Sequence, residues 1–144
     1  MDRSRIIAKE ISWLVPKLLR GLRAGFIGSG KITTSQMVTL MRIHERKTTR
    51  VGVLSREMQI SAPTITGVVD RLLRGGYLKR IRDRVDRRVV NVELTSKGEN
   101  LVKEMLSEIN NRWYGILRQL SEEERESYIR ILRKITQLLN KKNE

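Results

Sequence analysis

The chain has 144 residues, enough for one domain with a real core. Its 30 lysines and arginines outnumber its 16 acids, giving a formal net charge of +14 that favours a polyanionic partner. The lack of cysteine excludes a disulfide framework, a thiolate zinc site and a cysteine-based redox sensor. No apolar run approaches the roughly 18 residues that a membrane span needs. We therefore expect a cytoplasmic protein without membrane attachment.

The first predicted element is a long amphipathic helix over residues 3–23. Its apolar side chains recur at helical spacing, with arginine and lysine on the opposite side; they are Ile6, Ile7, Ile11, Leu14, Val15, Leu18, Leu19 and Leu22. We interpret Trp13 as a buried structural tryptophan, with a place in a cavity wall as the alternative. Residues 25–30 break the pattern and predict a loop. Because Gly30 and Lys31 are followed by Ile32, this is not a phosphate-binding loop.

A second helix is predicted from a cap at Thr33 or Thr34 to about Arg46. It contains His44, the only histidine. We interpret His44 as a surface or partly buried side chain, because the sequence offers no cysteine, second histidine or nearby acid pair as further metal ligands. A very short extended segment at 48–50 and a short third helix from about Val53 to Met58 follow.

The stretch from Ser61 to Arg74 reads as a fourth helix with clear signals at both ends. Ser61 can accept a hydrogen bond from the first turn, and Pro63 stands where a missing N–H costs nothing. Gly75 and Gly76 supply a residue that tolerates the left-handed conformation of a helix end. The short helix before it and the tight turn between them give helix-turn-helix spacing.

The two faces of this fourth helix differ in character. Ile65, Val69 and Leu72 fall on one side and predict a packing surface. The other side is slim enough to enter a groove about 12 Å wide; it carries Ala62, Pro63, Thr64, Thr66, Gly67, Asp70 and Arg71. An amphipathic helix alone is common in globular proteins, so the reading as a DNA-recognition helix depends on what surrounds it.

Two stretches with a period of two, 77–82 and 88–94, predict strands on either side of an arginine-rich loop. A β-hairpin with a basic tip beside a helix-turn-helix is the layout of a winged helix, whose tip can place arginines in the narrow minor groove. Residues 46–88 carry 12 basic and 4 acidic side chains, so the positive charge centres on this module.

Two further helices are predicted after the hairpin. Thr95 caps a long one from Ser96 to about Leu120, and Ser121 with Glu124 forms a capping box that starts the last. The fold class is therefore mainly α with a small β-hairpin, a winged helix-turn-helix with flanking helices.

The stretch from about 51 to 98 resembles the winged helix-turn-helix of the multiple antibiotic resistance regulator (MarR) family. The matching segments are Ser61-Ala62-Pro63-Thr64-Ile65-Thr66, Val69-Asp70-Arg71-Leu72, Gly76-Tyr77-Leu78, Asp86-Arg87-Arg88 and Val92-Glu93-Leu94-Thr95-Ser96-Lys97-Gly98. The resemblance implies a dimeric, mostly ligand-responsive transcription factor. It also implies that Asp86 and Arg88 are the wing pair, in which the arginine approaches the minor groove and the acid holds it in position.

On this resemblance the chain divides into an N-terminal dimerisation helix and loop (1–32), a winged helix-turn-helix DNA-binding domain (33–98) and C-terminal dimerisation helices (99–144). The partners are then double-stranded DNA and a second copy of the chain. An intramolecular packing of the three long helices is the alternative to the homodimer.

The predicted function is sequence-specific binding of a pseudo-palindromic operator, with repression as the outcome. The expected DNA-binding residues are Ser61, Ala62, Pro63, Thr64, Thr66, Arg71, Arg84, Asp86, Arg87 and Arg88. No catalytic residue, metal ligand or cofactor is expected. A small-molecule effector between the dimer helices and the winged helix is a further hypothesis, for which Trp13, Met37, Met41 and Trp113 are candidates, although the sequence has no polar cluster to coordinate a ligand.

The sequence leaves three alternatives to this function. A basic winged helix can bind DNA without sequence preference, as an architectural protein does. It can also bind protein or RNA. An enzyme is disfavoured, because the sequence shows no acid pair, no Gly-rich loop beside a nucleophile and only one histidine.

Overall fold

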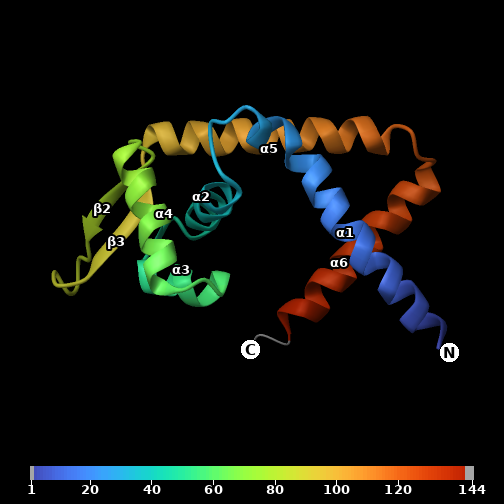
Figure 1. Ribbon diagram of the computed structural model, residues 1–144, viewed down its shortest axis with the longest axis horizontal. Helices are drawn as coiled ribbons and strands as arrows, with labels where there is room; N and C mark the ends of the chain where they lie inside the picture. Colours follow the sequence, from blue (N-terminus) through green and yellow to red (C-terminus); the bar gives the residue numbers. More distant parts are fainter. Residues whose placement is uncertain (1, 142–144) are drawn as a thin grey trace. The chain divides into compact units, whose positions relative to one another are not determined.

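The computed structural model of the protein describes residues 2–141, which form six helices and one three-stranded sheet. In chain order the elements are α1 (Arg3–Gly28), α2 (Thr34–Arg46), β1 (Thr48–Thr49), α3 (Val51–Met58), α4 (Ala62–Arg74), β2 (Leu78–Arg82), β3 (Val90–Leu94), α5 (Ser96–Leu117) and α6 (Glu122–Asn140) (Figure 1). The sheet has the order β1-β3-β2, and both pairings are antiparallel. The predicted fold class, mainly α with a small hairpin, is confirmed.

The described residues divide into two compact units, one ending at Glu108 and the other beginning at Ile109. The core of the first unit joins α2, α3, α4, the sheet and the start of α5. Its largest fully buried apolar side chains are Leu40, Ile43, Leu54, Ile65, Val69, Leu72, Val92, Val102 and Met105. The predicted packing face of α4 is therefore the face that enters this core.

The first helix is longer than its sequence pattern predicts. We expected a loop from Gly25, but α1 continues to Gly28. Phe26 lies one turn after Leu22, and both side chains are 7% exposed, so burial carries the helix past Gly25. The Ser29 hydroxyl donates to the Phe26 carbonyl over 2.7 Å at the helix end. The interpretation of Trp13 as buried was wrong for this chain, in which its side chain is 68% exposed.

The elements before α4 follow the sequence signals closely. Thr33 caps α2 through a capping box with Gln36, as expected for one of the two candidate threonines. The extended segment at 48–50 forms the strand β1, in which Thr49 pairs with Val92 of β3. α3 begins at Val51, two residues earlier than predicted.

The second unit contains the end of α5 and the whole of α6. α5 ends at Leu117, three residues before the predicted end. At this end the Arg125 guanidinium donates hydrogen bonds to the carbonyls of Leu117 and Leu120, each over 2.7 Å. The predicted capping box at Ser121 is confirmed. The Trp113 and Tyr128 rings pack with their centroids 5.6 Å apart. Within residues 2–141, no side chain of α6 is buried.

Candidate nucleic-acid interface

The start of α4 differs in one respect from its sequence prediction. Ser61 is the N-cap residue, but its side chain makes no capping hydrogen bond with the backbone of the first turn. Its hydroxyl lies instead 2.7 Å from the hydroxyl of Thr64. Pro63 in the first turn removes one of the donors that such a cap would serve. The two hydroxyls therefore form an exposed polar pair at the tip of the helix.

The face of α4 opposite the core is exposed except at Gly67 and Asp70, which are partly buried. Its exposed residues include Ala62, Pro63, Thr64, Thr66 and Arg71. A β-carbon built on Gly67 would have one neighbour within 4 Å, the Arg71 Nη2 atom at 3.9 Å. The guanidinium of Arg71 thus lies over the backbone at Gly67, and the middle of this face carries a positive charge without a bulky side chain.

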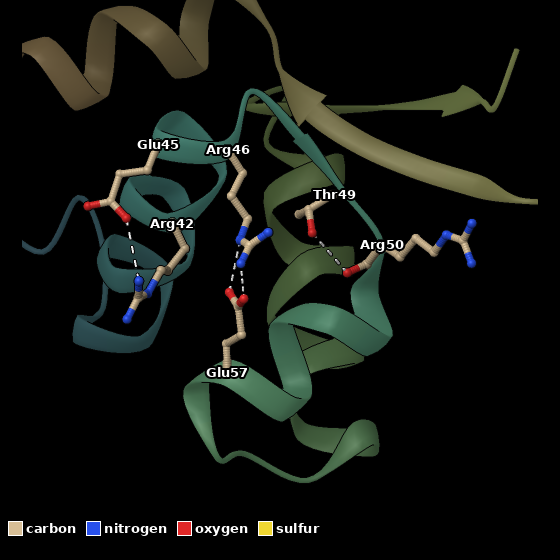
Figure 2. A network of polar contacts seen from close by, with 6 residues as sticks. All are labelled: Arg42, Glu45, Arg46, Thr49, Arg50 and Glu57. Carbon is tan, nitrogen blue, oxygen red and sulfur yellow. Dashed lines mark hydrogen bonds and ion pairs between the residues drawn. The ribbon is translucent and has the colours of Figure 1, made fainter. Parts of the chain in front are cut away.

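The helix before the recognition helix is held by polar contacts on both sides. Figure 2 shows Arg46 reaching from the end of α2 to Glu57 of α3, where its Nε atom donates over 3.0 Å. The turn into α4 places Gln59 in the left-handed region, with φ of 52°. The Ser55 hydroxyl closes this turn by donating to the Ile60 carbonyl over 2.7 Å. The turn between α3 and α4 is thus supported by the Ser55 side chain and has Gln59, not a glycine, in the left-handed conformation.

The end of α4 is held against the start of α5. Gly76 has φ of +75°, and the N–H groups of Gly76 and Tyr77 donate to the carbonyls of Leu73 and Leu72. This is the Schellman arrangement, which satisfies carbonyls at a helix end. From the other side, the Thr95 hydroxyl donates to the Gly76 carbonyl over 2.5 Å.

Residues of the first turn of α5 complete this clamp. The Lys97 ammonium donates to the Gly75 carbonyl over 2.7 Å and lies 4.5 Å from the centre of the Tyr77 ring. The backbone N–H of Thr95 donates to the Tyr77 carbonyl, while its hydroxyl accepts from the N–H of Gly98 and so caps α5 as predicted. The recognition helix and α5 are consequently joined through three successive carbonyls.

The wing between β2 and β3 is a turn organised by two aspartates. One carboxylate oxygen of Asp83 accepts from the N–H groups of Val85 (2.8 Å) and Asp86 (3.1 Å). These two hydrogen bonds, led by the one from Asp86, hold the pKa of the Asp83 carboxyl below its usual range. The other oxygen accepts from the Asn91 amide over 3.3 Å. Hydrogen bonds to the Asp83 side chain therefore stabilise the wing turn.

The second aspartate holds the wing arginine. Asp86 Oδ1 accepts from both the backbone N–H (3.0 Å) and the Nε atom (3.2 Å) of Arg88. The predicted pairing of Asp86 with Arg88 is thus present, and the arginine side chain is still 93% exposed. These hydrogen bonds make Arg88 part of the wing turn. β3 therefore begins at Val90 and not at Arg88 as predicted.

A contact that the sequence did not reveal links the wing to the recognition helix. Arg80 of β2 donates to Asp70 of α4 over 3.2 Å. The only acid on the exposed face of α4 within the described residues is therefore neutralised by a strand of the wing. The α4 face and the wing stand next to each other in the fold (Figure 1).

Known proteins resemble this chain in sequence and in fold. A solved structure of a MarR family protein from Bacillus stearothermophilus is 31% identical to it, covering 97% of this chain and 99% of that chain with a TM-score of 0.83. The chain belongs to the MarR family. The family model itself matches residues 32–90, which run from just before α2 to the first residue of β3.

Two curated relatives of this MarR protein come from Bacillus subtilis (strain 168). The HTH-type transcriptional regulator YsmB is 27% identical over 111 residues, 77% of this chain and 76% of YsmB. The HTH-type transcriptional repressor YetL is 26% identical over 109 residues, 74% of this chain and 65% of YetL. As a MarR family member, the protein is a DNA-binding transcriptional regulator with a winged helix-turn-helix.

The structure of this MarR protein gathers the predicted site residues into two groups. Those of α4 share its exposed face, and Arg84, Asp86, Arg87 and Arg88 share the wing turn. Sequence reasoning missed the Arg80–Asp70 link and the role of Asp83. An aspartate two or three residues before the N–H groups it accepts from is a recognisable turn signal, but nothing in the pattern pairs Arg80 with Asp70.

Among residues 2–141 there is no group of three or more His, Asp or Glu side chains that could hold a metal ion. None of the described helices is long and apolar enough to cross a membrane. The partly buried His44 lies with Nδ1 3.0 Å from Glu99 Oε2, which joins α2 to α5.

Proposed function

We propose that this regulator binds a specific DNA duplex as a homodimer and represses transcription from it. The observation that carries the proposal is that α4 presents exposed polar side chains and Arg71 next to a wing with three exposed arginines. The Asp70–Arg80 ion pair links these two elements. The polar side chains that we assign to DNA contact are not buried in the core. A recognition helix and a wing in this arrangement can address one major groove and the adjacent minor groove together.

The two elements have different roles in this proposal. Ser61, Ala62, Pro63, Thr64 and Thr66 meet base edges and thymine methyl groups in the major groove, and Arg71 reaches a base or a phosphate. At the wing, Arg84 and Arg87 contact phosphates, while Arg88, oriented by Asp86, enters the minor groove. Support comes from the exposure of all these side chains except the half-buried Asp86.

The homodimer is proposed from the apolar faces of the long helices. Eight large apolar side chains of α1 are between 36% and 68% exposed; they are Ile6, Ile7, Ile11, Trp13, Leu14, Val15, Leu18 and Leu19. On α6, Ile129, Ile131, Leu132, Ile135, Leu138 and Leu139 are 39% to 61% exposed. Soluble monomers rarely expose apolar patches of this extent, and a second copy of the chain would cover them.

The three predicted segments keep their roles in the proposal: dimerisation for 1–32 and 99–144, DNA binding for 33–98. A two-fold dimer reads a pseudo-palindrome whose half-sites lie roughly 10 base pairs apart. A small-molecule effector would then act by changing the separation of the two recognition helices. Of the residues considered for its pocket, Met37 is 2% exposed and belongs to the core.

A selection from randomised duplex DNA tests the proposal directly. We expect a palindromic consensus, bound by two chains per duplex. The alternative of a non-specific or architectural DNA-binding protein predicts equal recovery of all sequences and a steep dependence of affinity on salt concentration. A protein- or RNA-binding winged helix predicts no enrichment of any duplex.

A further inference from the structure

The wing tip presents an apolar side chain to solvent. Val85 is 97% exposed, which makes it the most exposed large hydrophobic residue in the part of the chain that the structure describes. It stands beside Arg84 and close to Arg87, in a chain whose other exposed apolar side chains lie mostly on the long helices. Val85 is not part of the core of the first unit.

The backbone at Val85 is fixed, although the side chain is free. Its N–H donates to the Asp83 carboxylate over 2.8 Å, and the next N–H donates to the same oxygen. The turn is closed on both sides, by the Asp83 N–H to the Val89 carbonyl (2.9 Å) and the Val89 N–H to the Asp86 carbonyl (3.0 Å). Val85 is therefore held outward by a preformed turn, and its burial in a complex would require little ordering of the backbone.

The surroundings of Val85 indicate where such burial would occur. Arg84, Arg87 and Arg88 are all exposed around the tip, and they attract it to a polyanion. The minor groove of DNA is about 6 Å wide, and its walls are the carbon-rich faces of the deoxyribose rings. Proteins that enter this groove often pair basic side chains with an apolar one.

We propose that Val85 packs against the deoxyribose walls of the minor groove when the wing binds the operator, and that this apolar contact adds to the ionic contact of Arg88. The inference rests on the proposed function, because it requires the wing to enter the groove. It assigns a role to a side chain that carries no charge and no hydrogen-bonding group. Its contribution to affinity should therefore be insensitive to salt.

The test compares three variants of the full-length protein on the duplex recovered by selection. Val85→Thr keeps the size and branching of the side chain and replaces one methyl group with a hydroxyl. Val90→Thr makes the same change in β3 of the same hairpin, on the face that carries Val92 into the core. Arg88→Ala removes the wing cation. Affinity is measured for each over a range of salt concentrations, with thermal unfolding as a check on folding.

We expect Val85→Thr to weaken binding about three- to tenfold, as suits the loss of one methyl from an apolar contact, with the salt dependence unchanged. Val90→Thr should bind like the wild type. Arg88→Ala should weaken binding and reduce the slope of log affinity against log salt by about one.

Each other outcome overturns a defined part of the account. If Val85→Thr binds like the wild type while Arg88→Ala is weakened, the wing binds through arginine alone and the inference fails while the proposed function stands. If Val85→Thr also lowers the salt slope, the substitution has displaced the cations and the apolar contact is refuted. If the wild type shows no preference for the selected duplex, the proposed function fails and the inference fails with it.

Discussion

Gly98, in the first turn of α5, lies directly against the backbone carbonyl of Tyr77: a β-carbon on Gly98 would come within 2.1 Å of that oxygen. Because the obstacle is backbone, it cannot move aside as a side chain would. We expect Gly98→Ala to lower the free energy of unfolding by about 1–3 kcal/mol through overpacking, measured by urea denaturation. Gly52→Ala is the matched control, since a β-carbon there meets nothing within 4 Å. Equal stability of both variants would show that the α4–α5 junction is not close-packed.

The N-caps of α2 and α4 should differ in how much stability an alanine substitution removes. Thr33→Ala removes a capping box and should cost about 1 kcal/mol of stability. Ser61→Ala should cost less, because the Ser61 hydroxyl bonds the Thr64 hydroxyl and not the backbone. Thermal unfolding distinguishes the two. A larger loss of stability at Ser61 than at Thr33 would contradict this assignment of the caps.

Because Asp83 organises the wing turn, we expect the stability of that turn to depend on pH only in the acid range. The folded-state pKa of Asp83 is depressed by the N–H groups that it accepts from. Its contribution to wing stability is therefore fully present above the unfolded-state pKa, near 3.9, and is lost as the pH falls through the lower folded-state pKa. NMR titration of the Val85 and Asp86 amides should show a midpoint below that of an ordinary aspartate. A midpoint at or above the ordinary value would rule out these hydrogen bonds, and Asp83→Asn should abolish the transition.

Removing the Arg88 side chain should lower the affinity for the operator without unfolding the protein. Its side chain is 93% exposed, so Arg88→Ala should leave the dimer and its unfolding temperature nearly unchanged. Operator binding should weaken by several-fold or more, because a cation is removed from the groove. Arg74→Ala, at the end of the recognition helix, is the control and should cost less, since we expect that arginine to contribute only to the general field. Unchanged binding by the Arg88 variant would refute the wing assignment.

If the apolar face of α1 lies in the dimer interface, one charged residue on that face should weaken the dimer. Leu14 is 53% exposed on this face, whereas Ser12 lies on the opposite side of the same helix turn and donates to the Ala8 carbonyl. Leu14→Glu should shift the chain towards monomer in sedimentation equilibrium, because it would bury a charge in the proposed interface. Ser12→Glu should not. A wild-type chain that sediments as a monomer would contradict the dimer itself.

The sequence was most informative where one residue determines the local backbone. Pro63 and Gly76 mark the ends of α4, Ser121 and Glu124 start α6, and the period of two marks both strands of the wing. These signals are local, so they can be recognised without knowing the fold. The prediction of the winged helix-turn-helix depended on them and on the spacing between them.

Each prediction that failed depends on a side-chain contact that the helix and turn signals do not reveal. α1 continues past Gly25 because Phe26 finds a place in the core, and α5 stops at Leu117 because Arg125 competes for its last carbonyls. The hydroxyl of Ser61 was expected to cap the backbone, but Thr64 stands near enough to bind it instead. Phe26 packs in a core formed by residues distant in sequence, whereas Thr64 is a local neighbour of Ser61 and no helix-start signal shows which partner the hydroxyl takes.

The central claim is that the α4 face and the wing read sequence and do not merely attract DNA. The most direct measurement is the ratio of dissociation constants for the selected palindromic duplex and a scrambled duplex of equal length, at physiological salt. We predict a ratio of about 10³ or more in favour of the palindrome, with two chains bound. A ratio near one, with affinity that falls steeply as salt rises, would contradict the account and leave only the positive charge of the chain to explain its binding.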